Sequence, residues 1–184
     1  MRSFILASAS PRRKDLLAKI IPEFKIQPSS LDEVVEPGLL PWEVVESLAL
    51  QKAQDIAQKQ NDACFILGSD TIVSIHGEIL GKPLNDANAF EMLSKLSGKK
   101  HRVITGVALI QWPENEMQVT HEVSEVTFKE LSSQEIHAYI QTGEPLDKAG
   151  AYAIQGGAGD FVASLVGSYD NIVGLPLDTV QRLL

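Results

Sequence analysis

The sequence has 184 residues, of which 44% are hydrophobic and 22% charged, and this composition is typical of one folded domain. The formal net charge is -8, and no long run of lysine or arginine offsets it, so a DNA or RNA backbone would be repelled. A nucleic-acid polymer is therefore disfavoured as a partner, whereas a small anion held by a few local cations is compatible with the composition.

The first half of the chain alternates between short apolar runs and helical patterns. Ser10 suits the N-cap of the first helix and Pro11 its first position. A turn at His76 and Gly77 indicates a β-hairpin. Strands are expected at residues 4–7, 23–27, 65–73 (interrupted by polar residues at 68–70) and 78–80, and helices at 11–20 and 41–60.

The second half contains longer strand patterns. Gly98 and Gly143 each end a helical pattern, and Ser132 with Glu135 forms a capping box ahead of the second of them. Helices are expected at 86–96, from 133 to Gly143 and after Pro176, and strands at 101–112, 117–129, 151–154 and 161–166. Because several neighbouring strands look antiparallel while helices alternate with strands, the chain predicts a mixed α/β fold.

Cellular location follows from the cysteine count and from the apolar runs. The single cysteine, Cys64, excludes an intramolecular disulfide and fits a reducing compartment. Its apolar surroundings favour a small buried side chain over a catalytic thiol. The apolar stretch near residue 4 is too short for a secretory signal, and no run approaches the length of a membrane span. We expect a cytoplasmic protein without a membrane partner.

The start of the first helix carries an unusual charge. Acidic residues normally stabilise this end of a helix, yet here Arg12 and Arg13 follow the small polar residues Ser8 and Ser10. A strand, a small-residue loop and a helix N-terminus with two arginines favour a phosphate cradle over a solvated basic turn. The glycines and the lysine of a Walker A loop are missing.

Acids and lysines elsewhere are ambiguous when each is taken alone. Asp70 interrupts an apolar strand, where it either caps a turn or provides a carboxylate that binds metal or activates water. Lys52 and Lys82 are most simply explained as solvated charges, and Asp32 and Glu33 as loop acids. These acids gain weight only if they converge on Asp70 around a divalent ion, which prefers oxygen ligands.

A glycine-flanked segment near residue 155 adds a candidate for base recognition. Gln155 ends an apolar run, and its amide offers one acceptor and two donors in one plane. This suits the imide edge of uracil or thymine, although a surface glutamine in a glycine-rich loop is the simpler reading.

Five motifs together resemble the Maf family. They occur in the order of that family and spread across nearly the whole chain. They are Ser8-Ala9-Ser10-Pro11-Arg12-Arg13, Gly68-Ser69-Asp70-Thr71-Ile72-Val73, Gly81-Lys82-Pro83, residues 147–156 and residues 167–176. The resemblance implies a fold similar to inosine triphosphate pyrophosphatases, with an elongated mixed sheet flanked by helices. It also implies a single Maf-like domain over 1–184, with two closely joined lobes around a central cleft.

The same resemblance implies an activity and its residues. Nucleoside triphosphates would be hydrolysed between the α- and β-phosphates, with a divalent cation (Mg or Mn) as cofactor. Asp70 would be the general base and Glu33 a second acid at the metal. The phosphate binders would be Ser8, Arg12, Arg13, Lys52 and Lys82.

Base preference divides the family into two branches. Arg12, Thr71 and Gln155 resemble the branch that hydrolyses dTTP and UTP. The alternatives are the same reaction on modified nucleotides such as 7-methyl-GTP, and a non-catalytic nucleotide sensor that regulates division. The intact acid and lysine set argues against the sensor. A homodimer is common among similar proteins, and the sequence itself leaves the oligomeric state open.

Overall fold

The structure is a computed structural model that describes residues 2–184. Its strands are β1 (Ser3–Leu6), β2 (Lys25–Ile26), β3 (Cys64–Ile75), β4 (Glu78–Leu80), β5 (Lys100–Trp112), β6 (Glu116–Phe128) and β7 (Val162–Val166). Its α-helices are α1 (Pro11–Leu17), α2 (Pro41–Ala57), α3 (Asp86–Leu96), α4 (Ser133–Ile140), α5 (Tyr169–Val173) and α6 (Leu177–Leu183). Three 3-10 helices are η1 (Glu144–Asp147), η2 (Ala149–Ala151) and η3 (Gly157–Phe161).

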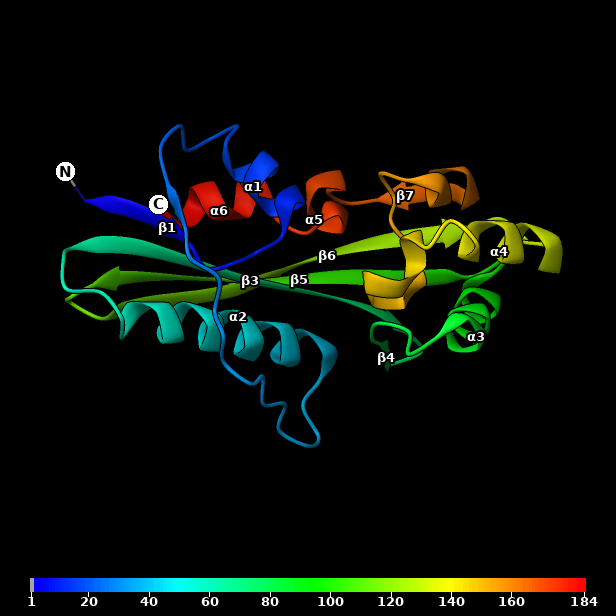
Figure 1. Ribbon diagram of the computed structural model, residues 1–184, viewed down its shortest axis with the longest axis horizontal. Helices are drawn as coiled ribbons and strands as arrows, with labels where there is room; N and C mark the ends of the chain where they lie inside the picture. The colour runs from blue at the N-terminus through cyan, green and yellow to red at the C-terminus, as the bar shows by residue number, and fades with distance from the viewer. Residues whose placement is uncertain (1) are drawn as a thin grey trace. The chain divides into compact units, whose positions relative to one another are not determined.

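The strands of the described chain form one seven-stranded mixed sheet (Figure 1). The order is β2-β1-β3-β5-β6-β7, and β4 pairs with β3 outside this path. β1 is parallel to β2 and to β3, whereas β4 is antiparallel to β3 and β7 is antiparallel to β6. The predicted mixed α/β fold and the predicted hairpin between β3 and β4 are confirmed.

The chain divides into two compact units. Unit 1 contains the described residues up to 71, together with 105–122 and 174–184, and unit 2 contains 72–104 and 123–173. The strands β3, β5 and β6 each contribute residues to both units.

Unit 1 packs helices on both faces of its part of the sheet. Figure 1 shows α2 on one face and α1 with α6 on the other. The α2 face is lined by small residues: a Cβ added to Gly68 would meet the Ala49 carbonyl oxygen at 2.1 Å, and one added to Gly106 would meet the Val45 carbonyl oxygen at 2.2 Å. These two glycines therefore let the backbone of α2 lie directly against β3 and β5.

Unit 2 has an aromatic core. His101 Nε2 and Tyr152 Oη are 2.8 Å apart, and Phe128 meets both rings edge-on at centroid distances of 4.9 Å. Burial lowers the pKa of His101 to about 4, so the imidazole is neutral at neutral pH. Burial likewise raises the pKa of Tyr152 far above its ordinary value. This core holds its polar groups in uncharged form.

One expectation for the last third of the chain is corrected, and one helix there was not expected. The strand expected at 151–154 is wrong, because Gly150 and Ala151 have positive φ angles of 69° and 61° that turn the backbone away from an extended path. Tyr139 Oη accepts the N–H of Ala153 at 3.0 Å in place of a strand partner. The short helix α5 was not expected, since its five residues are too few to show a helical period.

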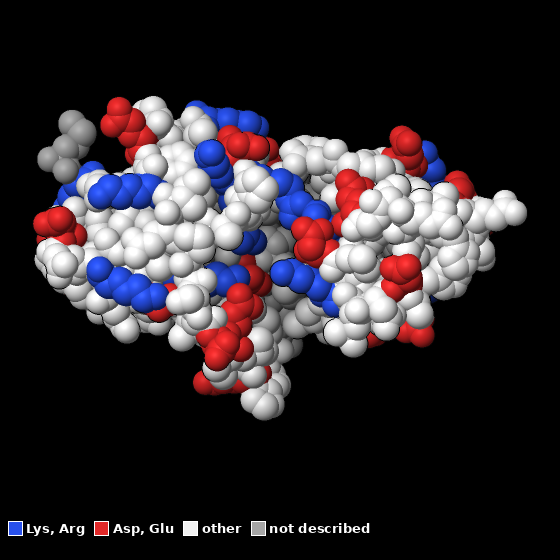
Figure 2. Space-filling model, in the orientation of Figure 1, with Lys and Arg blue, Asp and Glu red and all other residues white. Residues whose placement is uncertain are grey.

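The surface and the helices carry two further observations. On the face shown in Figure 2, acidic and basic side chains are intermixed over the surface. Among residues 2–184, every helix is too short or too polar to cross a membrane.

Candidate functional site

Strand β3 presents two different chemistries on its two faces. Gly68 and Asp70 face α2, because an added Cβ on Gly68 would touch Ala49 and Asp70 contacts Lys52. Ser69 and Thr71 alternate with them and contact Gly174 and Arg13 instead. β1 pairs with β3 up to Leu67 and β4 pairs from Val73, so residues 68–72 lie between these two pairings. The predicted site strand therefore offers an acid on one face and hydroxyls on the other.

Lys52 joins the two acids that the sequence singled out. Its Nζ lies 2.5 Å from Asp70 Oδ1 and 2.9 Å from Glu33 Oε1. The side chains of Lys52 and Asp70 are 15% and 14% exposed, whereas Glu33 is 47% exposed. Of the two loop acids, Glu33 is the one that joins Asp70, while Asp32 is exposed outside this group. The close approach of α2 over Gly68 is what brings Lys52 within reach.

Arg13 reaches three parts of unit 1 from the first turn of α1. Its Nε donates to the Gly174 carbonyl oxygen at 2.8 Å, Nη1 to Ser8 Oγ at 3.3 Å and Nη2 to Thr71 Oγ1 at 3.0 Å. Burial lowers the pKa of Arg13, and the negative charge of Asp70 opposes this shift. The guanidinium remains charged, so unit 1 holds a desolvated cation near Asp70.

In the loop between β1 and α1, serine side chains accept hydrogen bonds from nearby main-chain N–H groups. Ser10 caps α1 by accepting the Arg13 N–H at 3.5 Å, as predicted, and the Ser10 N–H donates to Ser8 Oγ at 3.2 Å. These two N–H groups are thus already paired. Arg12 lies partly exposed beside them, and its charge contributes to lowering the pKa of Arg13.

Gly174 and Thr105 are members of this network that sequence reasoning missed. The Gly174 carbonyl oxygen accepts from Arg13 and, at 3.2 Å, from Ser69 Oγ. Thr71 Oγ1 and the buried Thr105 Oγ1 are 2.9 Å apart. The fifth motif, residues 167–176, contains Gly174, but its contribution is a backbone carbonyl, which no side-chain pattern reveals.

The other two predicted binding residues belong to unit 2. Lys82 is exposed between β4 and α3, next to Gly81, whose carbonyl oxygen accepts the Gly150 N–H at 3.0 Å. Gln155 is exposed in the turn ahead of η3. The contacts described above link the unit 1 residues alone, so the roles of Lys82 and Gln155 stay predictions.

The carboxylates of unit 1 fit a divalent cation that is only partly held by protein. Asp70 and Glu33 supply oxygen ligands, and both already lie against one cation, the Lys52 ammonium. In residues 2–184 no three His, Cys, Asp or Glu side chains are grouped to hold a metal ion. Mg²⁺ commonly binds through one or two carboxylates plus substrate phosphates and water, and this donor set matches that pattern.

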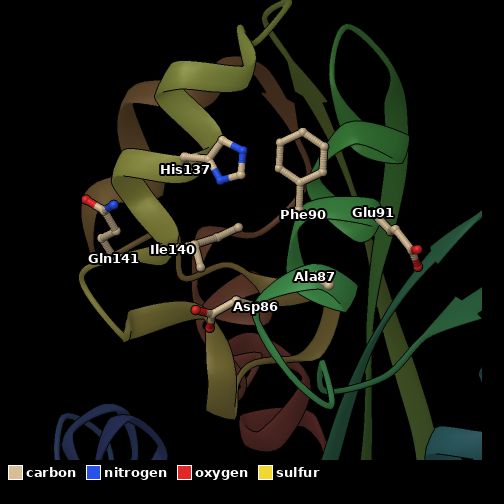
Figure 3. Close-up of a pocket in the computed structure, with 7 residues that line it drawn as sticks. All are labelled: Asp86, Ala87, Phe90, Glu91, His137, Ile140 and Gln141. Carbon is tan, nitrogen blue, oxygen red and sulfur yellow. The ribbon is translucent and has the colours of Figure 1, made fainter.

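A separate hollow lies between α3 and α4 in unit 2 (Figure 3). It has a volume of about 520 Å³, and Phe90 stacks on His137 there at a centroid distance of 4.6 Å. Asp86, Glu91 and Ile140 also line it. None of the residues predicted for the site is among those that line it, so the hollow is distinct from the Lys52 group.

Relatives with known names match the whole length of this chain. A dTTP/UTP pyrophosphatase from Moorella thermoacetica is 51% identical over 184 residues, which cover 100% of this chain and 94% of that relative. One from Halalkalibacterium halodurans is 50% identical, with coverage of 100% and 95%.

Two solved structures align with about two thirds of this chain. A HAM1 protein from Coxiella burnetii is 17% identical, with a TM-score of 0.49 over 70% of this chain and 73% of its own. A nucleoside-triphosphatase (dITP/XTP pyrophosphatase) from Mycobacterium abscessus is 20% identical, with a TM-score of 0.44 over 68% and 72%.

The family model described as Maf-like protein matches residues 3–184. This range includes all five motifs and every residue of the Lys52 and Arg13 networks. Because the match extends over nearly the whole chain, the protein belongs to the Maf-like family.

Proposed function

We propose that this protein hydrolyses dTTP and UTP to the nucleoside monophosphate and pyrophosphate, with the help of a divalent metal ion. The observation that carries the proposal is the Asp70–Lys52–Glu33 group of unit 1, near the partly buried cation Arg13. It combines a fixed carboxylate, a second acid and positive charge in the donor types that a triphosphate and its metal require. The names of the full-length relatives support the same substrates.

In the proposed reaction Asp70 is the general base. It takes one proton from a water molecule whose oxygen forms a bond to the α-phosphorus. The bond from the α-phosphorus to the bridging oxygen breaks, and pyrophosphate leaves with that oxygen. Lys52 fixes the orientation of the Asp70 carboxylate through its 2.5 Å contact with Oδ1. A positioned base of this kind contributes about 10²–10⁴-fold to the rate.

The cationic residues of unit 1, together with Ser8, would hold the triphosphate. Arg12, Arg13 and Ser8 surround the start of α1, where an anion is favoured by the helix dipole. Because Arg13 is tied to Gly174 and Thr71, its guanidinium would meet phosphate oxygens in a fixed orientation. Lys82 is proposed as a further phosphate binder on the strength of its Gly-Lys-Pro motif.

A divalent ion, Mg²⁺ or Mn²⁺, would be held by Asp70 and Glu33 together with phosphate oxygens. When bound, it offsets the negative charge of the phosphates and polarises the bond under attack. The role of the protein is to bring the two carboxylates together, which Lys52 does in this structure.

Gln155 is proposed to select the base, whereas Thr71 is proposed to act through a phosphate binder. The Gln155 amide matches the donor and acceptors of the uracil or thymine imide. Thr71 is placed differently from a simple base contact, because its hydroxyl already pairs with Arg13 and Thr105. We therefore expect Thr71 to act on the substrate through the position of Arg13.

A panel of nucleoside triphosphates tests the proposal, assayed with Mg²⁺ or Mn²⁺ and with chelator. We expect pyrophosphate release from dTTP and UTP, dependent on metal, and slower release from purine nucleotides and 7-methyl-GTP. Release of orthophosphate would contradict the proposed bond cleavage. Binding of dTTP without any turnover would instead favour the nucleotide sensor.

The compartment and the assembly are proposed on the sequence alone. The single cysteine supports a reducing, cytoplasmic compartment. We propose a nucleoside triphosphate as the main partner, and a homodimer as in similar proteins.

A further inference from the structure

The segment that carries Glu33 is held in place without burial. Residues 27–36 lie between β2 and α2 in the chain and have no regular secondary structure. Their large apolar side chains are open to solvent: Leu31 is 46% exposed, Val34 63% and Val35 50%. Because hydrophobic stabilisation scales with the apolar area removed from water, it contributes little here. The position of Glu33 must depend on other contacts.

Polar side chains of α2 provide those contacts. Asp55 Oδ2 accepts from Ser29 Oγ at 2.8 Å and from the Ser30 N–H at 3.2 Å. Lys52 pairs with Glu33 at 2.9 Å, and Gln51 bonds to Val34. Three positions of one helix therefore hold successive parts of the segment, and Gln51 holds the residue next to Glu33.

The side chain of Gln51 forms hydrogen bonds with both main-chain polar groups of Val34. Its Oε1 accepts the Val34 N–H at 3.1 Å, and its Nε2 donates to the Val34 carbonyl oxygen at 2.7 Å. The same Nε2 donates to Ser47 Oγ at 3.0 Å, one turn earlier on α2, which fixes the side chain. A carboxamide supplies a donor and an acceptor on one planar group, whereas a carboxylate at neutral pH only accepts. Glutamine thus suits both bonds where glutamate does not.

We propose that Gln51 is a positioning residue, which holds Glu33, the second acid of the proposed site, in place. By fixing the main chain of Val34, it fixes the adjacent Glu33 and holds that carboxylate beside Lys52 and Asp70. The inference rests on the proposed function, in which Glu33 is an acid at the divalent ion. Gln51 itself touches neither substrate nor metal and acts through the backbone.

Two substitutions of Gln51 test this role. Gln51→Ala removes both bonds to Val34. Gln51→Glu keeps the size and the acceptor but loses the donor and sets a negative charge against the Val34 carbonyl oxygen. Loss of a group that orients a metal ligand typically costs about 10–100-fold in metal affinity. We expect the Kd for Mn²⁺, measured by electron paramagnetic resonance with a non-hydrolysable dUTP analogue present, to rise by about this factor in both variants. The kcat for dTTP should recover at saturating Mn²⁺.

Gln54→Ala is the matched control. Gln54 lies on the same helix, and its Nε2 contacts Met117 Sδ at 3.5 Å, away from the segment. We expect an unchanged Kd for Mn²⁺. An equal response of Gln51→Ala and Gln54→Ala would overturn the inference.

A double-mutant cycle separates positioning from a general structural effect. If Gln51 acts through Glu33, then Gln51→Ala should cause no further loss of Mn²⁺ affinity in a Glu33→Gln background. A loss of the same size in both backgrounds would overturn the inference.

Hydrogen exchange gives a readout that needs neither metal nor turnover. The Val34 amide should exchange faster in Gln51→Ala than in the wild type, with an unchanged midpoint of thermal unfolding. Equal exchange of the Val34 amide in the two proteins would contradict the proposed role of the Gln51 hydrogen bonds. Turnover of dTTP by the wild type tests the proposed function separately, so a protein that is active but insensitive at Gln51 would overturn this inference alone.

Discussion

Unit 1 holds partly buried side chains in charged form, whereas unit 2 holds buried polar side chains in neutral form. Unit 1 places Lys52 and Asp70 in direct contact with 15% and 14% of their side chains exposed, and it desolvates the Arg13 guanidinium nearby. Unit 2 encloses His101 and Tyr152 among aromatic rings, where burial depresses the pKa of the imidazole and raises that of the phenol. The first arrangement retains charge, and the second removes it.

This difference distinguishes the residues proposed for catalysis from the residues that stabilise the fold. A partly buried ion pair contributes little net stability, since desolvation of both charges offsets their attraction. The charges of unit 1 are therefore better explained by a ligand than by the fold. A neutral hydrogen-bonded pair such as His101 with Tyr152 avoids the larger cost of desolvating a charge and is compatible with a core. Substitutions should accordingly affect catalysis in one unit and folding in the other.

The largest expected effect is on Asp70. Asp70→Asn keeps the shape of the side chain but removes its ability to take a proton, so kcat for dTTP should fall about 10²–10⁴-fold. This loss corresponds to about 3–5 kcal/mol in the activation free energy. Steady-state pyrophosphate release measures the loss, and calorimetric titration with a non-hydrolysable analogue should show that nucleotide binding survives.

Stability provides the control for that variant. Lys52 keeps Glu33 as a partner and its charge is not left unpaired, so the free energy of unfolding should fall by less than the about 3–5 kcal/mol that removing one partner of a buried ion pair usually costs. Turnover close to that of the wild type would remove Asp70 from the role of base. A large loss of stability would mean that unit 1 uses its charges for folding, which would break the contrast between the units.

The next effect is the pH dependence contributed by His101. Its pKa is about 4 in the folded protein and about 6.5 when unfolded, so the unfolded state binds the proton more readily. The stabilisation is complete above pH 6.5 and is lost as the pH falls from 6.5 towards 4. The full loss is about 3 kcal/mol, from a difference of about 2.5 pKa units at 1.36 kcal/mol each.

Urea unfolding between pH 8 and pH 4 measures this dependence. His101→Gln retains a polar partner for Tyr152 but does not titrate, so its unfolding free energy should vary less over the same range. Carboxylates titrate in both proteins, and the difference between the two curves isolates His101. Parallel curves would contradict a neutral buried imidazole. The kcat of the variant at pH 7.5 should match that of the wild type, because His101 lies in the aromatic core.

The smallest expected effect is at Gln155, the one position where unit 2 is proposed to read the substrate base. In Gln155→Glu an ionised carboxylate cannot donate to a carbonyl oxygen of the base. The kcat/KM for dTTP and UTP should fall about tenfold, equal to about 1.4 kcal/mol. Gln134→Glu, which adds the same charge on the exposed start of α4, should leave the kinetics unchanged. Equal kinetics for all three proteins would show that Gln155 does not select the base.

The regular part of the fold was predictable because its signals are local. The helix at 86–96 and the capping box at Ser132 agree with the structure, and the predicted hairpin is present. Residues 151–154 were misjudged because their apolar character reflects burial in the core and not strand pairing. Positive φ at the non-glycine residue Ala151 depends on tertiary contacts that a sequence pattern does not report.

The candidate site was predictable in its residue types but not in its connections. Asp70, Glu33 and Lys52 were named, and the structure joins them in one group. Gln51 carried no signal, because one glutamine on an amphipathic helix looks like any solvated residue. Its contacts go to a main chain, as do those of Arg13 with Gly174, and the sequence does not encode such contacts by residue type.

The alternation along β3 makes the register of this strand decisive for chemistry. A strand has a period of two, so one residue inserted before Gly68 would turn the hydroxyl of Ser69 or Thr71 towards Lys52 and point the acid at Arg13. The core could still find apolar residues on both sides of the strand. Length variation is therefore tolerable in the connections before and after β3, whereas within the strand a single insertion would separate Asp70 from Lys52 even in a chain that still folds.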